Sequence, residues 1–196
     1  MSGARRPWRL ALLACLAALT TCASPNPRLY TIAPVDGAVR GRGPNVILLQ
    51  QIGLARYLER SQFVRSSENY RLDVMTDDWW GEPLGAMLSR VLIDELSQRL
   101  PRSTVLNESG AVTSTTDATI AVNVRRLDQN AAGTLVLQAQ VSVTFKGRPE
   151  PVLRSFRFTV APGAPSVSAG VAAISVAVGQ LADGLASVLV AGPAAR

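Results

Sequence analysis

Apolar and polar residues alternate most regularly between residues 118 and 160. Three segments, 118–128, 134–145 and 154–160, place an apolar side chain at almost every second position, which is typical of strands with one buried and one wet face. The expected inward set is Ile120, Val122, Val124, Leu135, Leu137, Val141, Val143, Phe145, Phe156, Phe158 and Val160. The connections QNAAG and KGRPEP carry residues of hairpin turns. The pattern predicts an antiparallel meander.

Two stretches instead repeat apolar residues at three- and four-residue steps, the period of a helix. The first starts with Pro83, which suits a first helical turn, and ends before Pro101. Its expected core face is Leu84, Met87, Leu88, Val91, Leu92, Leu96 and Leu100. The second covers 166–190, with the seam Val167, Val171, Ile174, Val178, Leu181, Leu185 and Val188. Small residues flank this seam, so we expect close docking on the sheet, and the interior Gln180 and Asp183 argue against a membrane span.

Shorter apolar runs predict further strands at 28–34, 45–54, 69–75 and 103–109. Together these elements predict an α+β fold in which a mostly antiparallel sheet has two helices packed on one face. A single domain over residues 28–192 is long enough to bury one sizeable core.

The first 27 residues carry the signals of export. Arginines precede an apolar stretch that begins at Leu10 and is too short to span a membrane, so residues 1–21 read as a signal peptide. Cys22 then becomes a lipidation site, followed by a Pro-punctuated tether to residue 27. Cys15 is the competing lipidation site, but it leaves too short an apolar stretch before it. Cleavage after Ala23, which would leave the chain unlipidated, is the other alternative.

Composition narrows the chemistry further. The net charge of +6 includes three signal arginines, and no basic stripe interleaves with aromatic residues, so nucleic-acid binding has no support. Histidine is absent, which removes histidine-based acid–base catalysis, Ser-His-Asp triads and histidine-ligated metals. The only lysine, Lys146, lies in an expected turn. We therefore expect a protein that is not an enzyme and holds no metal or cofactor.

Five stretches of the chain form a series with fixed order and spacing: CASPNPRLYTIAP, ARYLERSQFVR, WWGEPLGAMLSRVLIDELSQRL, ATIAVNVRRLDQNAAGTLVLQAQVSV and VGQLADGLASVL. Over nearly the whole mature chain, this series resembles the PqiC-like ABC-type transport auxiliary lipoprotein family. Thr21 before the cysteine and Ser61 in LERSQ depart from the family pattern.

The resemblance implies a non-catalytic lipoprotein of the cell envelope, anchored through Cys22 in the inner leaflet of the outer membrane and facing the periplasm. Its partners would be a periplasmic MCE-domain protein and the inner-membrane ABC transporter, which together move phospholipid between the two membranes. The chain could also self-associate. Two alternatives stay open: a lipid-binding carrier with a groove under helix 166–190, and an assembly factor for outer-membrane components.

Candidate site residues cluster before the first helix. Neighbouring residues of an extended chain face opposite sides, so Trp79 and Trp80 cannot share one core. Trp80, which matches the family pattern, is expected in the core with Leu88, Leu92 and Leu181, and Pro83 is expected to shape the helix start. Trp79 is then a candidate partner contact, because aromatic residues are enriched at interface hot spots. Arg56, Arg60 and Arg65 could complete a basic partner interface or form a solvated loop.

Overall fold

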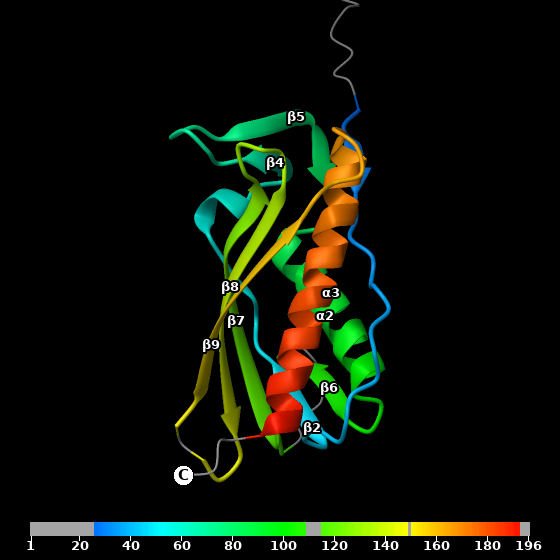
Figure 1. Cartoon of the computed structure of the whole chain (residues 1–196), viewed down its shortest axis with the longest axis vertical. Helices are drawn as coiled ribbons and strands as arrows, with labels where there is room; N and C mark the ends of the chain where they lie inside the picture. Colours follow the sequence, from blue (N-terminus) through cyan, green and yellow to red (C-terminus); the bar gives the residue numbers. More distant parts are fainter. Residues whose placement is uncertain (1–25, 109–114, 149, 193–196) are drawn as a thin grey trace, which may run out of the picture.

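Strand β7 (Ala118–Gln129) is the centre of the sheet in the computed structural model, which describes residues 26–108, 115–148 and 150–192. On one side β7 pairs antiparallel with β8 (Leu135–Phe145), and β8 pairs antiparallel with β9 (Val152–Val160) (Figure 1). The predicted inward residues of β7 and β8 are buried, and those of β9 are half-buried. The antiparallel meander is therefore confirmed.

The other side of β7 is shared by three short strands, one after another. These are β2 (Val46–Leu49), β3 (Gly53–Leu54) and β4 (Gln62–Ser66), and each pairs with β7 in parallel. The predicted continuous strand 45–54 is thus two strands: the Gln50 N–H still donates to the Ile120 carbonyl oxygen of β7, but residues 50–52 are not part of a strand.

Two further strands pair with the first and the last of these three short strands. β6 (Thr104–Asn107) pairs in parallel with β2, whereas β5 (Asp73–Trp80) pairs antiparallel with β4. β1 (Arg28–Tyr30) adds in parallel to β5, and a 3-10 turn, η1 (Arg56–Leu58), links β3 to β4. The predicted α+β single domain is confirmed, but its sheet is mixed. Alternation along one strand does not encode the direction of its neighbour, so the sequence could not show the parallel pairs.

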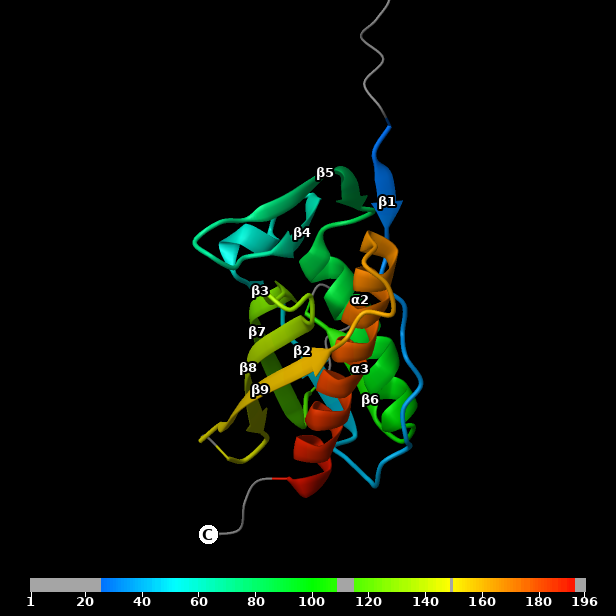
Figure 2. The same ribbon diagram turned by 45° about the horizontal axis from the view of Figure 1, so that its top comes forward.

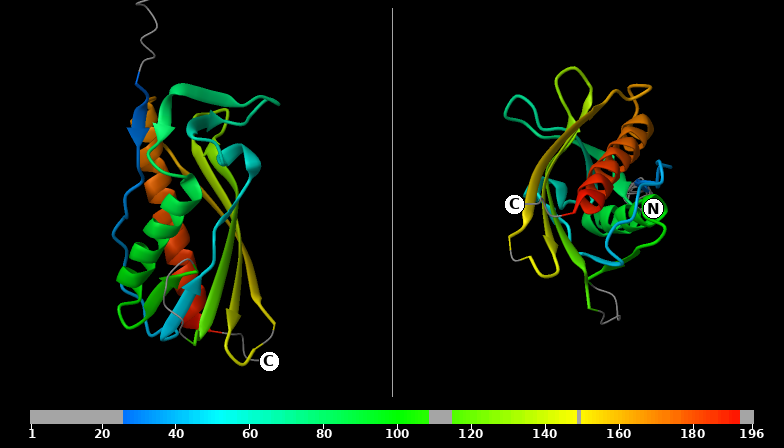
Figure 3. Two further views of the ribbon diagram at one scale, coloured as in Figure 1. Left: turned by 180° about the vertical axis from the view of Figure 1, so that it is seen from behind. Right: turned by 60° about the horizontal axis from the view of Figure 1, so that its bottom comes forward.

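The two helices, α2 (Leu84–Arg99) and α3 (Val167–Ala191), cover one face of the sheet (Figures 1 and 3). All of the predicted core face of α2 is buried, and Leu88, Leu92 and Leu181 are each at most 2% exposed. Pro83 differs from expectation, since it is exposed and precedes the helix as its N-cap residue. Its ψ of 128° is not helical, while its carbonyl accepts the Met87 N–H at 3.1 Å.

Helix α3 is long and apolar enough to cross a membrane by length and composition, yet most of it is buried against β8, β9 and α2. Small residues make this close contact: a Cβ on Gly184 would lie 2.7 Å from the ring of Phe156. The expected docking of this helix on the sheet is confirmed.

Residues 31–44, here called the strap, correct the prediction of a strand over 28–34. After β1 the chain leaves the sheet and runs along the outside of the helices, as the blue segment in Figure 3 shows. Its N–H groups bind side chains instead of a neighbouring strand: Ala33 donates to Ser175 Oγ and Val35 to Glu95 Oε1.

The β4–β5 hairpin corrects the strand predicted over 69–75. Asn69 and Tyr70 adopt left-handed backbone conformations, with φ of 57° and 58°, and form the turn of the hairpin. Tyr70 is completely exposed and Leu72 is 39% exposed, so their alternation with polar residues reflects no buried face. Two consecutive left-handed residues are the geometry of a tight hairpin turn, which Asn favours.

Candidate docking surface

The four predicted interface residues all lie between residues 56 and 79. This part of the chain comprises η1, β4 and β5 and lies at the end of the molecule where the chain enters β1 (Figure 2). We call it the tether end. Cys22 and Cys15, the two candidate lipidation sites, lie outside the described residues.

Trp79 and Trp80 face opposite sides of β5. Trp80 is 8% exposed and its ring lies 5.4 Å from that of Phe63, within the core. Trp79 is half-buried, and its indole N–H donates to the Thr76 carbonyl oxygen at 2.8 Å. Because the polar end of Trp79 is already bonded, it offers a partner the flat apolar part of its ring.

The three arginines differ in how firmly they are held. Arg56 and Arg60 are exposed, and no ion pair holds either of them within the described part of the chain. Arg65 is bound by Asp73 across the hairpin, with Nε 2.6 Å from Oδ2. The structure places these residues in one region, but within the described part of the chain Trp79 makes no hydrogen bond to any of the three arginines. Arg56 and Arg60 thus remain the freely available charges.

Exposed apolar residues at the same end were not predicted as site residues. Tyr70 stands at the tip of the β4–β5 hairpin, Leu72 follows it, and Leu29 of β1 is 66% exposed. The sequence signal for Tyr70 was the Asn-Tyr pair, since Asn readily takes the left-handed conformation that starts such a turn. These three residues extend the candidate surface.

A half-buried polar cluster around the buried Asp128 fixes the hairpin to β7. The Tyr57 hydroxyl donates to Asp128 Oδ2 at 2.7 Å, and Arg126 Nε donates to Asp128 Oδ1 at 2.9 Å. Arg126 also binds Glu68 at 2.5 Å, next to the hairpin turn. Burial, followed by the hydrogen bond to Asp128, raises the pKa of Tyr57, so it stays a neutral donor. The cluster holds the tether end in one orientation.

An ion pair attaches β1 to the same end. Arg28 Nη2 donates to Asp78 Oδ2 at 2.9 Å, and Asp78 is 1% exposed. The register of β1 against β5 places Leu29 beside Trp79. The first strand after the tether is therefore part of the candidate surface.

The strap is anchored by charges buried between the helices. Arg99, 1% exposed, lies 2.8 Å from Asp183 Oδ1 and donates to the carbonyl oxygens of Val35 and Gly179. Glu95 is fully buried and accepts the Val35 N–H at 2.8 Å. Burial raises the pKa of Glu95 to about 7, against the lowering effects of the Val35 N–H and of Arg99.

Sequence reasoning missed Glu95 and Arg99 because charged residues were expected on the wet side of α2. Both follow Leu88 and Leu92 at helical steps of three and four residues, so they lie on the same face of α2 as the predicted core residues. Within the described ranges no three Cys, Asp, Glu or His side chains form a group that could hold a metal ion.

A depression of about 520 Å³ lies between β9 and α3, where the carrier hypothesis expects a groove. Its lining combines Phe156 and Phe158 with the charged residues Arg40, Arg157 and Asp183. Beneath it, the ring of Phe156 packs directly on Gly184. The contact between sheet and helix here is closed by side chains, and the depression above it is partly charged.

Comparison with known proteins places this fold. The chain matches solved structures: one, a crystal structure of an uncharacterized protein, shares 16% identity with a TM-score of 0.70, covering 83% of this chain and 97% of that one. A second, from Xanthomonas campestris and assigned to the family model DUF330, shares 17% identity with a TM-score of 0.61, covering 80% and 91%. At these identities the likeness shows the fold alone. No curated protein matches the chain.

The family model described as "ABC-type transport auxiliary lipoprotein component" matches residues 30–186, from β1 to the last turns of α3. The match includes the strap, the tether end and both helices. The chain therefore belongs to the ABC-type transport auxiliary lipoprotein family.

Proposed function

We propose that this protein is a lipid-anchored docking subunit of an MCE/ABC-type phospholipid transport system, placed on the periplasmic face of the outer membrane. The observation that carries the proposal is the family match over residues 30–186, which gives a transport-auxiliary role. The anchor would be Cys22, at the end of a full-length apolar signal segment. The partners would be an MCE-domain periplasmic protein and its inner-membrane ABC transporter.

The position of the tether end supports docking near the membrane. Only three residues separate Cys22 from Asn26, a reach of roughly 13 Å at about 3.3 Å per residue. A lipid on Cys22 would thus hold the hairpin, β1 and Trp79 close to the inner leaflet. A partner that carries phospholipid to this membrane would meet the protein there.

The chemistry of the tether end suits a protein partner. Trp79 and Tyr70 offer aromatic surface, which is enriched at interface hot spots. Arg56 and Arg60 are exposed charges that would steer an acidic partner surface and would act mainly on the association rate. We assign the interface to Trp79, Arg56, Arg60 and Arg65, extended by Tyr70.

We also propose that the protein performs no chemistry. The sequence contains no histidine, and once the signal peptide is removed its only cysteine is the one expected to carry lipid. Two carboxylates of the described chain are held by structural neighbours: Asp128 accepts from Tyr57, and Asp183 accepts from Arg99.

The carrier alternative places lipid between β9 and α3. The depression there favours it only weakly, since a phospholipid needs a largely apolar lining and this one contains two arginines and an aspartate. Recovery of stoichiometric phospholipid with the partner-free protein would favour the carrier. The third option, an assembly factor for outer-membrane components, would be favoured if crosslinking in cells captured such a component in place of an MCE-domain protein.

Fractionation of cells tests the anchor. Cys22→Ala should release the protein into the soluble periplasm, whereas Cys15→Ala should leave it in the outer-membrane fraction. A mature chain that mass spectrometry finds unmodified and beginning at Ser24 would contradict lipidation. Co-purification of an MCE-domain protein after crosslinking tests the partner, and hydrolysis of ester or phosphate substrates by the pure protein would contradict the non-catalytic role.

A further inference from the structure

In the part of the chain that the structure describes, the sheet lacks a strand at the position next to β3 on the side away from β7. β6 continues the sheet beyond β2, and β5 continues it beyond β4, but within the described residues no strand pairs with the outer edge of β3. An unpaired strand edge is a template for another extended chain. The gap is bounded by the end of β6 on one side and by η1 on the other.

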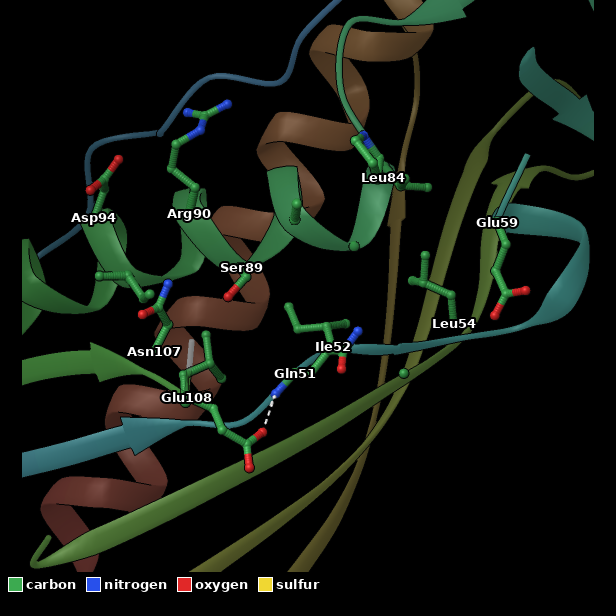
Figure 4. Close-up of a pocket in the computed structure, with 16 residues that line it drawn as sticks. Gln51, Ile52, Leu54, Glu59, Leu84, Ser89, Arg90, Asp94, Asn107 and Glu108 are labelled. Atoms are coloured by element: carbon green, nitrogen blue, oxygen red, sulfur yellow. Dashed lines mark hydrogen bonds between the residues drawn. The ribbon is translucent and has the colours of Figure 1, made fainter. Parts of the chain in front are cut away.

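A groove of about 1020 Å³ occupies this gap, between α2 and residues 51–54 (Figure 4). Its wall is partly apolar, with Ile52 and Leu54 from the strand side and Leu84 and Ile93 from α2. In Figure 4 Ser89 points from α2 toward residues 51–54, and Glu108 and Glu59 lie at opposite ends of this segment. The groove therefore lies between α2 and residues 51–54, with a carboxylate beyond each end of that segment.

The backbone at this edge is directed toward the groove. Ala55 donates its N–H to Val124 of β7 at 2.9 Å, so alternation along the strand turns the N–H and C=O of Leu54 away from β7. The Gln51 N–H also points away from β7, because Glu108 Oε2 accepts it at 3.2 Å. The Glu108 side chain thus takes the place of a neighbouring strand at this one backbone N–H.

Charge identifies the kind of segment that fits. Three carboxylates line the groove, Glu59, Asp94 and Glu108, although the chain has more basic than acidic residues. The one lining arginine, Arg90, is paired with Glu82 at 2.6 Å. A segment with apolar side chains in its middle and a basic residue near each end would complement both the wall and the two terminal glutamates.

We infer that this groove binds an extended, basic segment of a partner protein, which adds to β3 as an extra strand. The segment pairs with the outward backbone of Leu54, packs apolar side chains on Ile52 and Ile93, and places lysine or arginine near Glu59 and Glu108. The groove adjoins the tether end through Glu59, but none of the five residues assigned to the interface there lines it, so either site can fail without the other.

Peptide binding tests the site. The probe is the blocked peptide Lys-Val-Thr-Val-Lys, fluorescently labelled and titrated with the detergent-solubilised full chain. We expect saturable binding, and binding at least about tenfold weaker for Glu-Val-Thr-Val-Glu. In an extended peptide the threonine N–H points to one edge and the two valine N–H groups point to the other. N-methylation at the threonine or at both valines therefore blocks one edge at a time, and only the peptide whose blocked edge faces β3 should lose binding. Equal binding of both N-methylated peptides would overturn strand addition.

Matched variants locate the binding. Ala86→Trp fills the groove from an exposed position of α2 and should abolish binding, while Ser97→Trp, exposed elsewhere on the helix, should not. The double change Glu59→Gln and Glu108→Gln should weaken binding, whereas Asp77→Asn on β5 should leave it unchanged. The proposal is overturned if Ala86→Trp still binds the peptide, or if the variant abolishes self-association of the free chain, which would make a second copy the occupant.

Discussion

The meander β7–β9 and the segment 28–80 belong to one sheet but are held together by different interactions. β7, β8 and β9 pair antiparallel through neighbouring hairpins and bury a regular apolar face. Segment 28–80 pairs mainly through distant, partly parallel contacts, with register shifts in β4–β5. Its position depends on charged groups: Arg28–Asp78, Arg126–Glu68 and the Arg99 cluster.

This difference indicates which part of the molecule provides structural support and which part is available for binding. Regular packing in the meander and α3 builds a frame, and segment 28–80 carries the exposed features: Tyr70, Leu29, Arg56, Arg60 and the unpaired edge of β3. Loops and irregular segments on a rigid scaffold are where binding residues concentrate. The contrast predicts that charge changes will act on segment 28–80 and will leave the meander folded.

The largest effect is expected for Arg99→Ala. It removes the buried partner of Asp183 and of the carbonyl oxygens of Val35 in the strap and Gly179 in α3, and it leaves Glu95 without its neighbouring cation. Loss of one member of a buried charge cluster costs about 3–5 kcal/mol of unfolding free energy. Hydrogen exchange should show the Val35 and Arg40 amides losing more protection than the amides of β7 and β8, whose loss cannot exceed the fall in the global unfolding free energy. Arg102→Ala, at an exposed position, is the control. Equal loss of protection in the strap and in β7 and β8 would contradict the difference between the two regions.

Leu92→Ala tests the core that both regions share. The side chain is fully buried in the middle of α2, so its truncation should cost about 2–5 kcal/mol. Arg90→Ala on the exposed side breaks a surface pair with Glu82 and a long, exposed hydrogen bond to Thr31 Oγ1, and should change stability by no more than about 0.5 kcal/mol. Denaturant unfolding measures both variants, and similar shifts for the two would mean that the helix face is wrongly assigned.

The buried Glu95 should make stability depend on pH. Its pKa is raised from 4.5 to about 7, so the folded protein binds the proton more tightly than the unfolded chain. The free energy of unfolding should therefore fall, by roughly 2–4 kcal/mol, as pH rises from about 4.5 to about 7, and level off above that. Glu95→Gln keeps the acceptor for the Val35 N–H and should flatten this slope. An unchanged slope in the variant would assign it to another group.

The smallest effects on stability are expected at the tether end. Trp79→Ala, and charge reversal of Arg56 or Arg60, should leave the circular dichroism spectrum unchanged and lower co-purification with the proposed MCE-domain partner. Loss of an aromatic anchor can weaken binding by about 2 kcal/mol or more, and an exposed charge acts through association rate and salt. Charge reversal of Arg154 on β9 is the control, and an equal loss with it would place the contact on the meander.

The sequence predicted the frame better than the site for physical reasons. The core face of α2 and the inward residues of β7 and β8 follow strict periods, and these local patterns survive folding. Glu95 and Arg99 were missed because their partners, Val35 and Asp183, are 60 and 84 residues away. The gap beside β3 could not be predicted, since it depends on which strands lie outside β2 and β4. Tyr70 was assigned to a strand, because alternation alone does not distinguish a buried face from an exposed turn.

Site-specific photo-crosslinking in cells tests the central claim, that the tether end is where this lipoprotein meets its transport partner. A photoreactive residue would replace Tyr70 at the hairpin tip or, in a matched variant, Leu153 on β9, which is 65% exposed. We expect a crosslink to the proposed MCE-domain partner from position 70 and none from position 153. A crosslink from position 153 alone would contradict the claim and move the partner surface to the meander.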